Sequence, residues 1–115
     1  MALGRALRNV LVIDSGAPCN SSTPHSHNFL TQDGNTPHEI TAIARGQLTT
    51  YDNIDFYDDW AESAVRAANG FEVAVTDGSQ FTAKKLIFAT GIKDLLPQIK
   101  GFAECWGKSV LHCPY

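Results

Sequence analysis

The sequence lacks the features that mark several large classes of protein. Its 115 residues hold only 3 cysteines, at unrelated spacings, so a disulfide-stapled scaffold is not expected. No apolar run approaches the roughly 18 residues that a membrane-spanning helix needs. Lys and Arg total 9 against 12 Asp and Glu, and the resulting net charge of −3 disfavours a nucleic-acid-binding protein. The opening MALGRALR precedes no long apolar segment, so we expect no secretory signal and a cytoplasmic protein.

The apolar residues that are present predict an α/β fold. A hydrophobic share of 43% supports a real core, and the length fits at most one ordinary domain. Val10–Ile13 and Leu86–Ala89 are continuous apolar runs of the kind found in buried parallel strands. Phe71–Val75 alternates between apolar and other residues, and it lies between the turn signals Asn69-Gly70 and Asp77-Gly78. We therefore expect a three-layer α/β arrangement with a small antiparallel meander attached.

Other segments are assigned from local signals. Helical turns are expected over Ala2–Leu7, and a further helix begins at Thr36, where Glu39 completes a capping box. The segment 59–68 is ambiguous, because its composition favours a helix whereas its neighbours favour an antiparallel strand. Short strands are expected at 53–56, 80–83 and 110–112, and 15–35 is a long loop of a kind that is usually functional or disordered.

Two strand ends carry candidate ligand-binding residues. Asp14 ends the first apolar run, where an acid can accept hydrogen bonds from a ribose diol, although taken alone such a residue is more often a helix N-cap or a loop acid. The G-x-G-x-x-G fingerprint that binds phosphate should precede such an acid by about 20 residues, but among the 13 residues here only Gly4 is glycine. Ala89, Thr90 and Gly91 form a small-residue turn that would let a ligand approach the backbone, although any tight turn looks similar.

Histidines and a cysteine are the other candidates for chemistry. His25, His27, Asn28 and His38 crowd the first loop, but they lack the ligand spacing of a good zinc site. We expect no metal there, and polar packing or cofactor contacts instead. Cys113 begins half of a possible Cys-x-x-Cys redox pair, whose second position would be residue 116. Taken alone, Cys113 reads as a packed thiol, and we interpret the two remaining cysteines as structural.

The ordered set of segments resembles a known family. LGRALRNVLVIDSGAPCN, HSHNFLTQDGNTPHEI, KKLIFATGIKDLLPQIKGFAECWG and SVLHCPY together resemble thioredoxin reductase-like flavoenzymes of the pyridine nucleotide-disulfide oxidoreductase superfamily. The resemblance covers essentially the whole chain. It implies a Rossmann-like FAD-binding fold whose antiparallel meander runs over 59–83, which favours a strand for the ambiguous segment.

The resemblance also assigns roles to residues. It places Asp14 on the adenosine ribose of FAD and Ala89, Thr90 and Gly91 beside the cofactor. It places the flavin-lining loop around Asn20 and from His25 through His27 to Asn28, and it makes Cys113 the first cysteine of the redox pair. The parent protein would pass hydride from NAD(P)H to FAD and then to a small-molecule or protein disulfide.

Measured against that family, the fold is incomplete. Met1 corresponds to the middle of a helix, so the first strand and the glycine fingerprint are missing, as is the NAD(P)H domain. Residues 1–115 are thus interpreted as the central part of an FAD-binding domain, inactive alone, from a parent expected to be a homo-oligomer without nucleic-acid or membrane partners. Two alternatives stay open: a slice of an oxygen-using dithiol oxidase, and a non-catalytic binding or assembly module.

Overall fold

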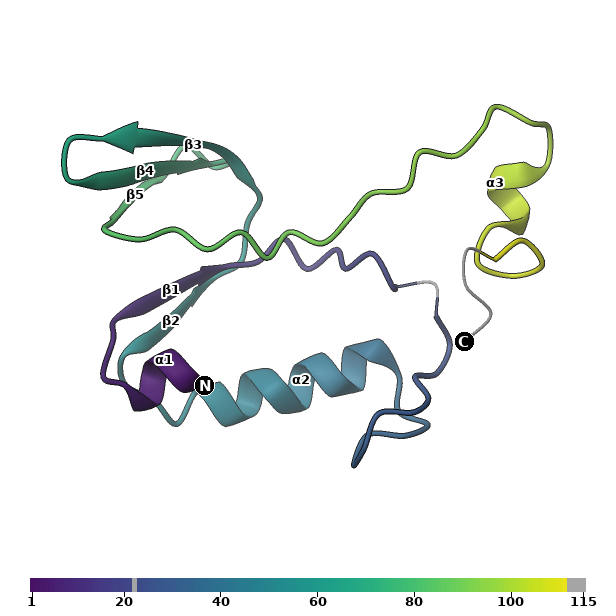
Figure 1. Cartoon of the computed structure of the whole chain (residues 1–115), viewed down its shortest axis with the longest axis horizontal. Coiled ribbons are helices and arrows are strands. Elements are labelled where there is room, and N and C mark those ends of the chain that lie inside the picture. Colours follow the sequence, from purple (N-terminus) through teal and green to yellow (C-terminus); the bar gives the residue numbers. More distant parts are fainter. Residues whose placement is uncertain (22, 112–115) are drawn as a thin grey trace. The chain divides into compact units, whose positions relative to one another are not determined.

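The computed structural model describes residues 1–21 and 23–111 of the chain. The elements follow the order α1, β1, α2, β2, β3, β4, β5, α3 (Figure 1). The chain divides into two compact units. The first comprises Met1–Pro18 and Arg45–Thr90, and the second comprises Cys19–Ala44 and the described residues after Thr90. All five strands of the described residues belong to the first unit, and α2 runs across the boundary.

A parallel pair of strands forms one sheet of the first unit. β1 (Val10–Ile13) pairs in register with β2 (Ile54–Tyr57), as Figure 1 shows. Both strands confirm predictions from the sequence, and β2 begins one residue later than expected. The backbone N–H of Asp14 extends the ladder by donating to the Tyr57 carbonyl at 3.0 Å. The carboxyl ends of β1 and β2 therefore lie together, as parallel pairing requires.

The short helix α1 (Ala2–Arg5) confirms the helical turns predicted at the start of the chain. It lies close to β2 because Gly4 has no side chain: a Cβ there would lie only 2.7 Å from Cδ1 of Ile54. The chain leaves the helix through Leu7, whose φ of 54° is the left-handed conformation that glycine usually takes at this position. The Leu7 side chain is 85% exposed, so it gains little from packing.

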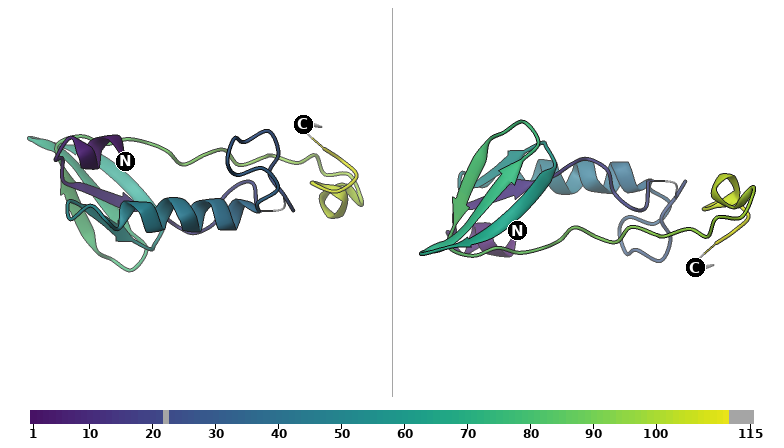
Figure 2. Two further views of the ribbon diagram at one scale, coloured as in Figure 1. Left: turned by 90° about the horizontal axis from the view of Figure 1, so that it is seen from below. Right: turned by 90° about the horizontal axis from the view of Figure 1, so that it is seen from above.

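The meander forms the second sheet of the first unit. β3 (Ala61–Ala67), β4 (Gly70–Val75) and β5 (Gln80–Ala83) are antiparallel in the order β3-β4-β5 and lie side by side in both views of Figure 2. The ambiguous segment 59–68 thus contains the strand β3, as the family resemblance implied. Val73 and Val75, on one face of β4, are the only buried large apolar side chains in the described part of the chain. The core is therefore small and centred on β4.

Helix α2 (Pro37–Leu48) begins where the capping-box pattern predicted. The Thr36 backbone N–H donates to Oε2 of Glu39 at 2.8 Å, and the Glu39 N–H donates to the Thr36 hydroxyl at 3.2 Å. Two otherwise unpaired backbone donors are thereby satisfied. The pKa of Glu39 is held below its usual range, chiefly because its carboxylate accepts from the Thr36 N–H and next because it accepts from the Thr36 hydroxyl.

The last residues of α2 lie in the first unit and contact β2. The Arg45 guanidinium carbon lies 4.5 Å from the ring centroid of Phe56, within the range of a cation–π contact. The same guanidinium forms an ion pair with Asp58, just beyond the strand. One side chain thus couples the end of the helix to the parallel pair.

One strand prediction was wrong in the described residues, and another lies only partly within them. Leu86–Ala89 belongs to no strand, and Ile87 and Phe88 are 72% and 74% exposed. An apolar run becomes a strand only when a neighbour pairs with its backbone, and no described strand lies beside this one. Of the strand expected at 110–112, the structure shows only an isolated bridge between Trp106 and Val110, and residue 112 lies outside the described part.

The described end of the second unit contains α3 (Phe102–Cys105). The rings of Phe102 and Trp106 stack with their centroids 5.8 Å apart. No helix among residues 1–21 and 23–111 is long and apolar enough to cross a membrane. The mixed α/β class with one parallel and one antiparallel sheet is confirmed.

Candidate functional site

Asp14 occupies the carboxyl end of β1, where the sequence placed it. Its Oδ1 accepts a hydrogen bond from the Gly16 backbone N–H at 2.9 Å, which closes a tight turn after the strand. Among the described residues, Oδ2 has no hydrogen-bond partner. The residue is half-buried. One carboxylate oxygen is therefore fixed by the backbone while the other is available to accept from a ligand hydroxyl.

The small-residue turn at 89–91 is split between the units. Ala89 and Thr90 are exposed at the end of the first unit and form no hydrogen bond with described residues. Gly91 belongs to the second unit and has a φ of 67°. A Cβ at Gly91 would lie 3.7 Å from the Cys19 sulfur, so this glycine lies beside the residue that precedes Asn20. Two of the predicted segments thus meet within the second unit.

Asn20 lies in a turn of the same loop. Its carbonyl accepts a hydrogen bond from the Thr23 N–H at 3.0 Å, and its side chain is exposed with no partner in the described part. Cys19 is an exposed free thiol, so the structure gives it no place in the core. The amide of Asn20 is consequently free to donate to or accept from a ligand.

The histidine-rich segment forms a closed loop within the second unit. The Ser26 N–H donates to the Asn35 carbonyl and the Gly34 N–H donates to the Ser26 carbonyl, both at 2.8 Å. Nδ1 of His25 lies 3.0 Å from the Gly34 carbonyl oxygen. These contacts join the two ends of the loop, so its backbone is fixed without help from a ligand.

Asp33 organises the tip of this loop and was missed by the sequence analysis. Its Oδ1 accepts from the Asn28 N–H at 2.8 Å and lies 3.6 Å from Nδ1 of His27. Asn28 has a φ of 59°, a conformation that asparagine tolerates better than most residues. The Asp33-Gly34 dipeptide is a turn signal that could have drawn attention to it. The predicted residues His27 and Asn28 are thus held together by one carboxylate.

A second polar cluster, also missed, joins the two sheets of the first unit. The Tyr57 hydroxyl, at the carboxyl end of β2, donates to Asp77 and lies 3.0 Å from the Ser79 hydroxyl, both on the turn between β4 and β5. Asp59 accepts from the Thr76 hydroxyl and from the Asp77 N–H at 3.0 Å. The turn itself was predicted, but nothing local in the sequence indicates its contact with β2.

Hydrogen bonding shifts the acidities in this cluster. The Tyr57 hydroxyl holds the pKa of Asp77 below its usual range, and the Thr76 hydroxyl does the same for Asp59. The pKa of Tyr57 is raised, chiefly because its hydroxyl donates a hydrogen bond to Asp77. Both carboxylates are therefore ionised at neutral pH and act as acceptors.

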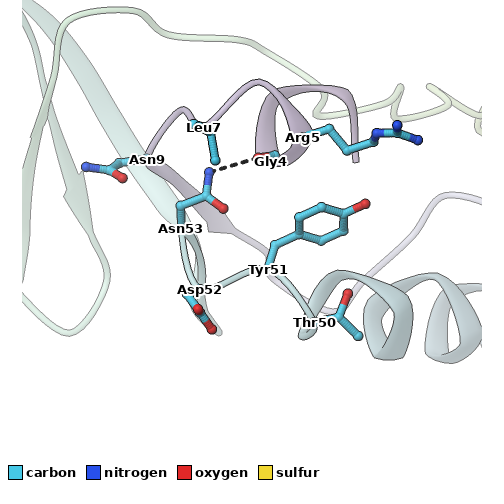
Figure 3. Close-up of a pocket in the computed structure, with 8 residues that line it drawn as sticks. All are labelled: Gly4, Arg5, Leu7, Asn9, Thr50, Tyr51, Asp52 and Asn53. Carbon is cyan, nitrogen blue, oxygen red and sulfur yellow. Dashed lines mark hydrogen bonds between the residues drawn. The ribbon is translucent and has the colours of Figure 1, made fainter.

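A hollow of about 600 Å³ lies at the opposite end of the parallel pair (Figure 3). It is formed by α1, the segment after Leu7 and the turn that precedes β2, with Tyr51 between the two helices and Asn53 donating to the Gly4 carbonyl at 3.1 Å. None of the site residues predicted from the sequence lines it. This hollow is therefore no candidate for the predicted cofactor site.

Two further predictions from the sequence concern metal ions and the redox thiol. Within residues 1–21 and 23–111, no group of three or more His, Cys, Asp or Glu side chains could hold a metal ion. Cys113, the predicted redox thiol, lies outside the described residues together with its neighbour His112.

Comparison with known proteins gives strong similarity over the whole chain. No family model matches the sequence. The chain is 36% identical over 118 residues to the thioredoxin reductase tcpT of Claviceps purpurea, a match that covers 100% of this chain and 37% of that protein. The chain therefore spans little more than a third of the length of the curated relatives it matches.

Solved structures agree with this similarity. An oxidoreductase from Agrobacterium tumefaciens superposes with a TM-score of 0.92 at 43% identity, covering 98% of this chain and 38% of that one. A Bacillus anthracis protein described as the thioredoxin reductase TrxB superposes with a TM-score of 0.93 at 30% identity, covering 99% of this chain and 39% of that one. The fold inferred from the sequence is thus the fold found in these proteins.

Proposed function

We propose that this chain, which is similar over its whole length to thioredoxin reductase-like oxidoreductases, forms the central part of an FAD-binding domain. The observation that carries the proposal is Asp14, a half-buried carboxylate at the carboxyl end of a parallel strand with one oxygen fixed and the other available. Ligands of open parallel sheets bind at this edge, and an acid there suits a ribose diol. The donor chemistry of the site therefore suits the adenosine half of FAD.

The remaining site residues have supporting roles. His27 and Asn28 sit on a loop that Asp33 has already ordered, so less conformational entropy is lost when a ligand is bound. Asn20 offers an exposed amide, and Ala89, Thr90 and Gly91 leave the backbone uncovered. The cofactor, when bound, supplies hydride and electron transfer, and the protein binds and orients it.

The activity of the whole protein extends beyond these residues. We propose that the whole protein takes electrons from NAD(P)H and delivers them to a small-molecule or protein disulfide. We expect it to do so in the cytoplasm and as a homo-oligomer. Cys113 supplies a redox thiol there. The 115-residue chain alone is inactive and binds FAD weakly, because pyrophosphate binding relies on backbone amides at a helix N-terminus and no glycine fingerprint precedes Asp14 in this sequence.

The test compares flavin affinity in variants of the longest gene product that contains this chain. Asp14→Asn keeps an oxygen for the Gly16 N–H but removes the negative charge. A hydrogen bond to a charged group contributes about 1.5–3 kcal/mol, so FAD affinity should fall by about tenfold to a hundredfold. Asp55→Asn is the matched control, because Asp55 is an exposed acid on the neighbouring strand with no partner in the described part. Equal affinities for the two variants would contradict the assignment of Asp14.

A further inference from the structure

A second hollow of the first unit is basic, although the chain as a whole is acidic. It has a volume of about 390 Å³ and lies where the turn between β3 and β4 meets the residues that follow β5. Arg66, Lys84 and Lys85 line it, together with Asn69 and Gly70 of the turn. No acidic residue lines it, and the net charge of the chain is −3. Three of the 9 Lys and Arg residues are thus gathered in one place.

The register of the sheet brings these cations together. Arg66 on β3 pairs with Phe71 on β4, and Phe71 pairs with Ala83 on β5, after which Lys84 and Lys85 follow directly. Neighbouring strands lie about 4.8 Å apart, so the backbones of the two edge strands are about 10 Å apart here. Arg66 and the two lysines therefore lie at the same end of the sheet, and their long side chains line one hollow.

Gly70 lets the turn between β3 and β4 lie directly against the residues that end and follow β5. A Cβ at this position would lie 2.2 Å from the Ala83 carbonyl oxygen and 3.0 Å from Cα of Lys84, so no other residue fits. This close packing brings the Asn69-Gly70 turn next to Lys84. Cationic side chains gathered in one hollow are a usual component of a phosphate site.

The cations have no other partner that explains their position. The two ion pairs among residues 1–21 and 23–111 involve other residues, and Arg66, Lys84 and Lys85 are all exposed. The hollow is also separate from the Asp14 edge. The turn between β4 and β5 contacts Tyr57 at that edge, whereas the basic hollow lies at the other end of β4, roughly 17 Å away along the strand.

We propose that this hollow is a binding site for a phosphate or pyrophosphate group, held by Arg66, Lys84 and Lys85 over the Asn69-Gly70 turn. The ligand is bound by charge rather than by apolar burial. Binding there weakens as ionic strength rises, because the cations are exposed to solvent.

The experiment titrates the full chain with inorganic pyrophosphate and follows backbone amide resonances by NMR, with sodium chloride at matched ionic strength as the reference. The expected shifts centre on Asn69, Gly70, Lys84 and Lys85. The double variant Lys84→Gln/Lys85→Gln should weaken the affinity by about tenfold, because two exposed charge contacts are lost. The matched control, Lys93→Gln/Lys100→Gln, removes the same amount of charge from the second unit. This variant should bind pyrophosphate with the affinity of the original chain.

Three outcomes would overturn the proposal. In the first, pyrophosphate causes no more shift than sodium chloride. In the second, the shifts centre on Asp14 and Gly16 instead. In the third, both double variants lose affinity equally, which would show a general effect of net charge. The amide spectrum of each variant reports whether it is folded, and Arg66→Gln provides an independent variant on the opposite strand, which should also weaken binding.

Discussion

Asn53 ties the first residues of the chain to the parallel sheet through three hydrogen bonds. Its side-chain amide donates to the carbonyl of Gly4 at 3.1 Å and to the carbonyl of Arg8 at 2.7 Å. Its own carbonyl accepts from the Val10 N–H at 2.9 Å. The residue is half-buried, so water replaces these contacts only in part. One side chain therefore holds both the helix and the entry to β1.

Replacing Asn53 with Asp keeps the size of the side chain and removes both donors. Each hydrogen bond contributes about 0.5–1.5 kcal/mol, so the loss should be about 1–3 kcal/mol. The new carboxylate also faces two carbonyl oxygens, which repel it. The loss in the free energy of unfolding should therefore lie near the upper end of that range. In a unit with only two large apolar side chains buried among its described residues, such a loss is a large share of the stability.

The assay is urea unfolding followed by circular dichroism, with amide hydrogen exchange at Val10 as a local probe. Asn9→Asp is the matched control, because Asn9 lines the same hollow and its exposed side chain has no hydrogen bond to described residues. Exchange at Val10 should quicken about tenfold or more in Asn53→Asp, since each 1.4 kcal/mol is a factor of ten. Equal stability and equal exchange in the two variants would refute this account of Asn53.

Three further predictions concern backbone conformation and pH. Gly70→Ala should cost about 1–3 kcal/mol in urea unfolding, because a Cβ would meet the Ala83 carbonyl oxygen; an unchanged midpoint would contradict the register of β4 and β5. Leu7→Gly should raise stability by up to about 1 kcal/mol, since it relieves a left-handed φ at an exposed side chain, and a loss would show that the side chain has a packing role. The pKa values of Asp59 and Asp77 in the folded state lie below their usual range. Their contribution to the free energy of unfolding is therefore complete at neutral pH, and it is lost as the pH falls below about 4 and through the folded-state pKa values. Thermal unfolding across that window should show a smaller acid-induced loss in Asp77→Asn than in the original chain.

Elements with local causes were predictable from the sequence. The capping box at Thr36 and Glu39 needs only four residues, and the structure forms it as expected. The strand at Phe71–Val75 follows from alternation and two flanking turns, and β4 agrees to within one residue. Segment 59–68 stayed ambiguous because its propensity opposed its context, and pairing with β4 decides in favour of a strand.

Elements that depend on distant partners were harder to predict. The run Leu86–Ala89 has the composition of a buried strand, but without a paired neighbour in the described chain it forms none. The roles of Asp33 and of Tyr57 with Asp77 depend on contacts that join residues up to 20 positions apart, which no local pattern encodes. Asp14 was predictable because a single local feature, an acid that ends an apolar run, fixes its place at the sheet edge.

The most direct test of the central claim is the cofactor content of the longest gene product that contains this chain. The protein should be purified under native conditions, denatured, and the released material identified by chromatography and mass spectrometry. The account predicts stoichiometric FAD, and it predicts that the 115-residue chain prepared in parallel releases little or none. A longer product that purifies folded but without flavin, and that takes up no added FAD, would contradict the assignment of this chain to an FAD-binding domain.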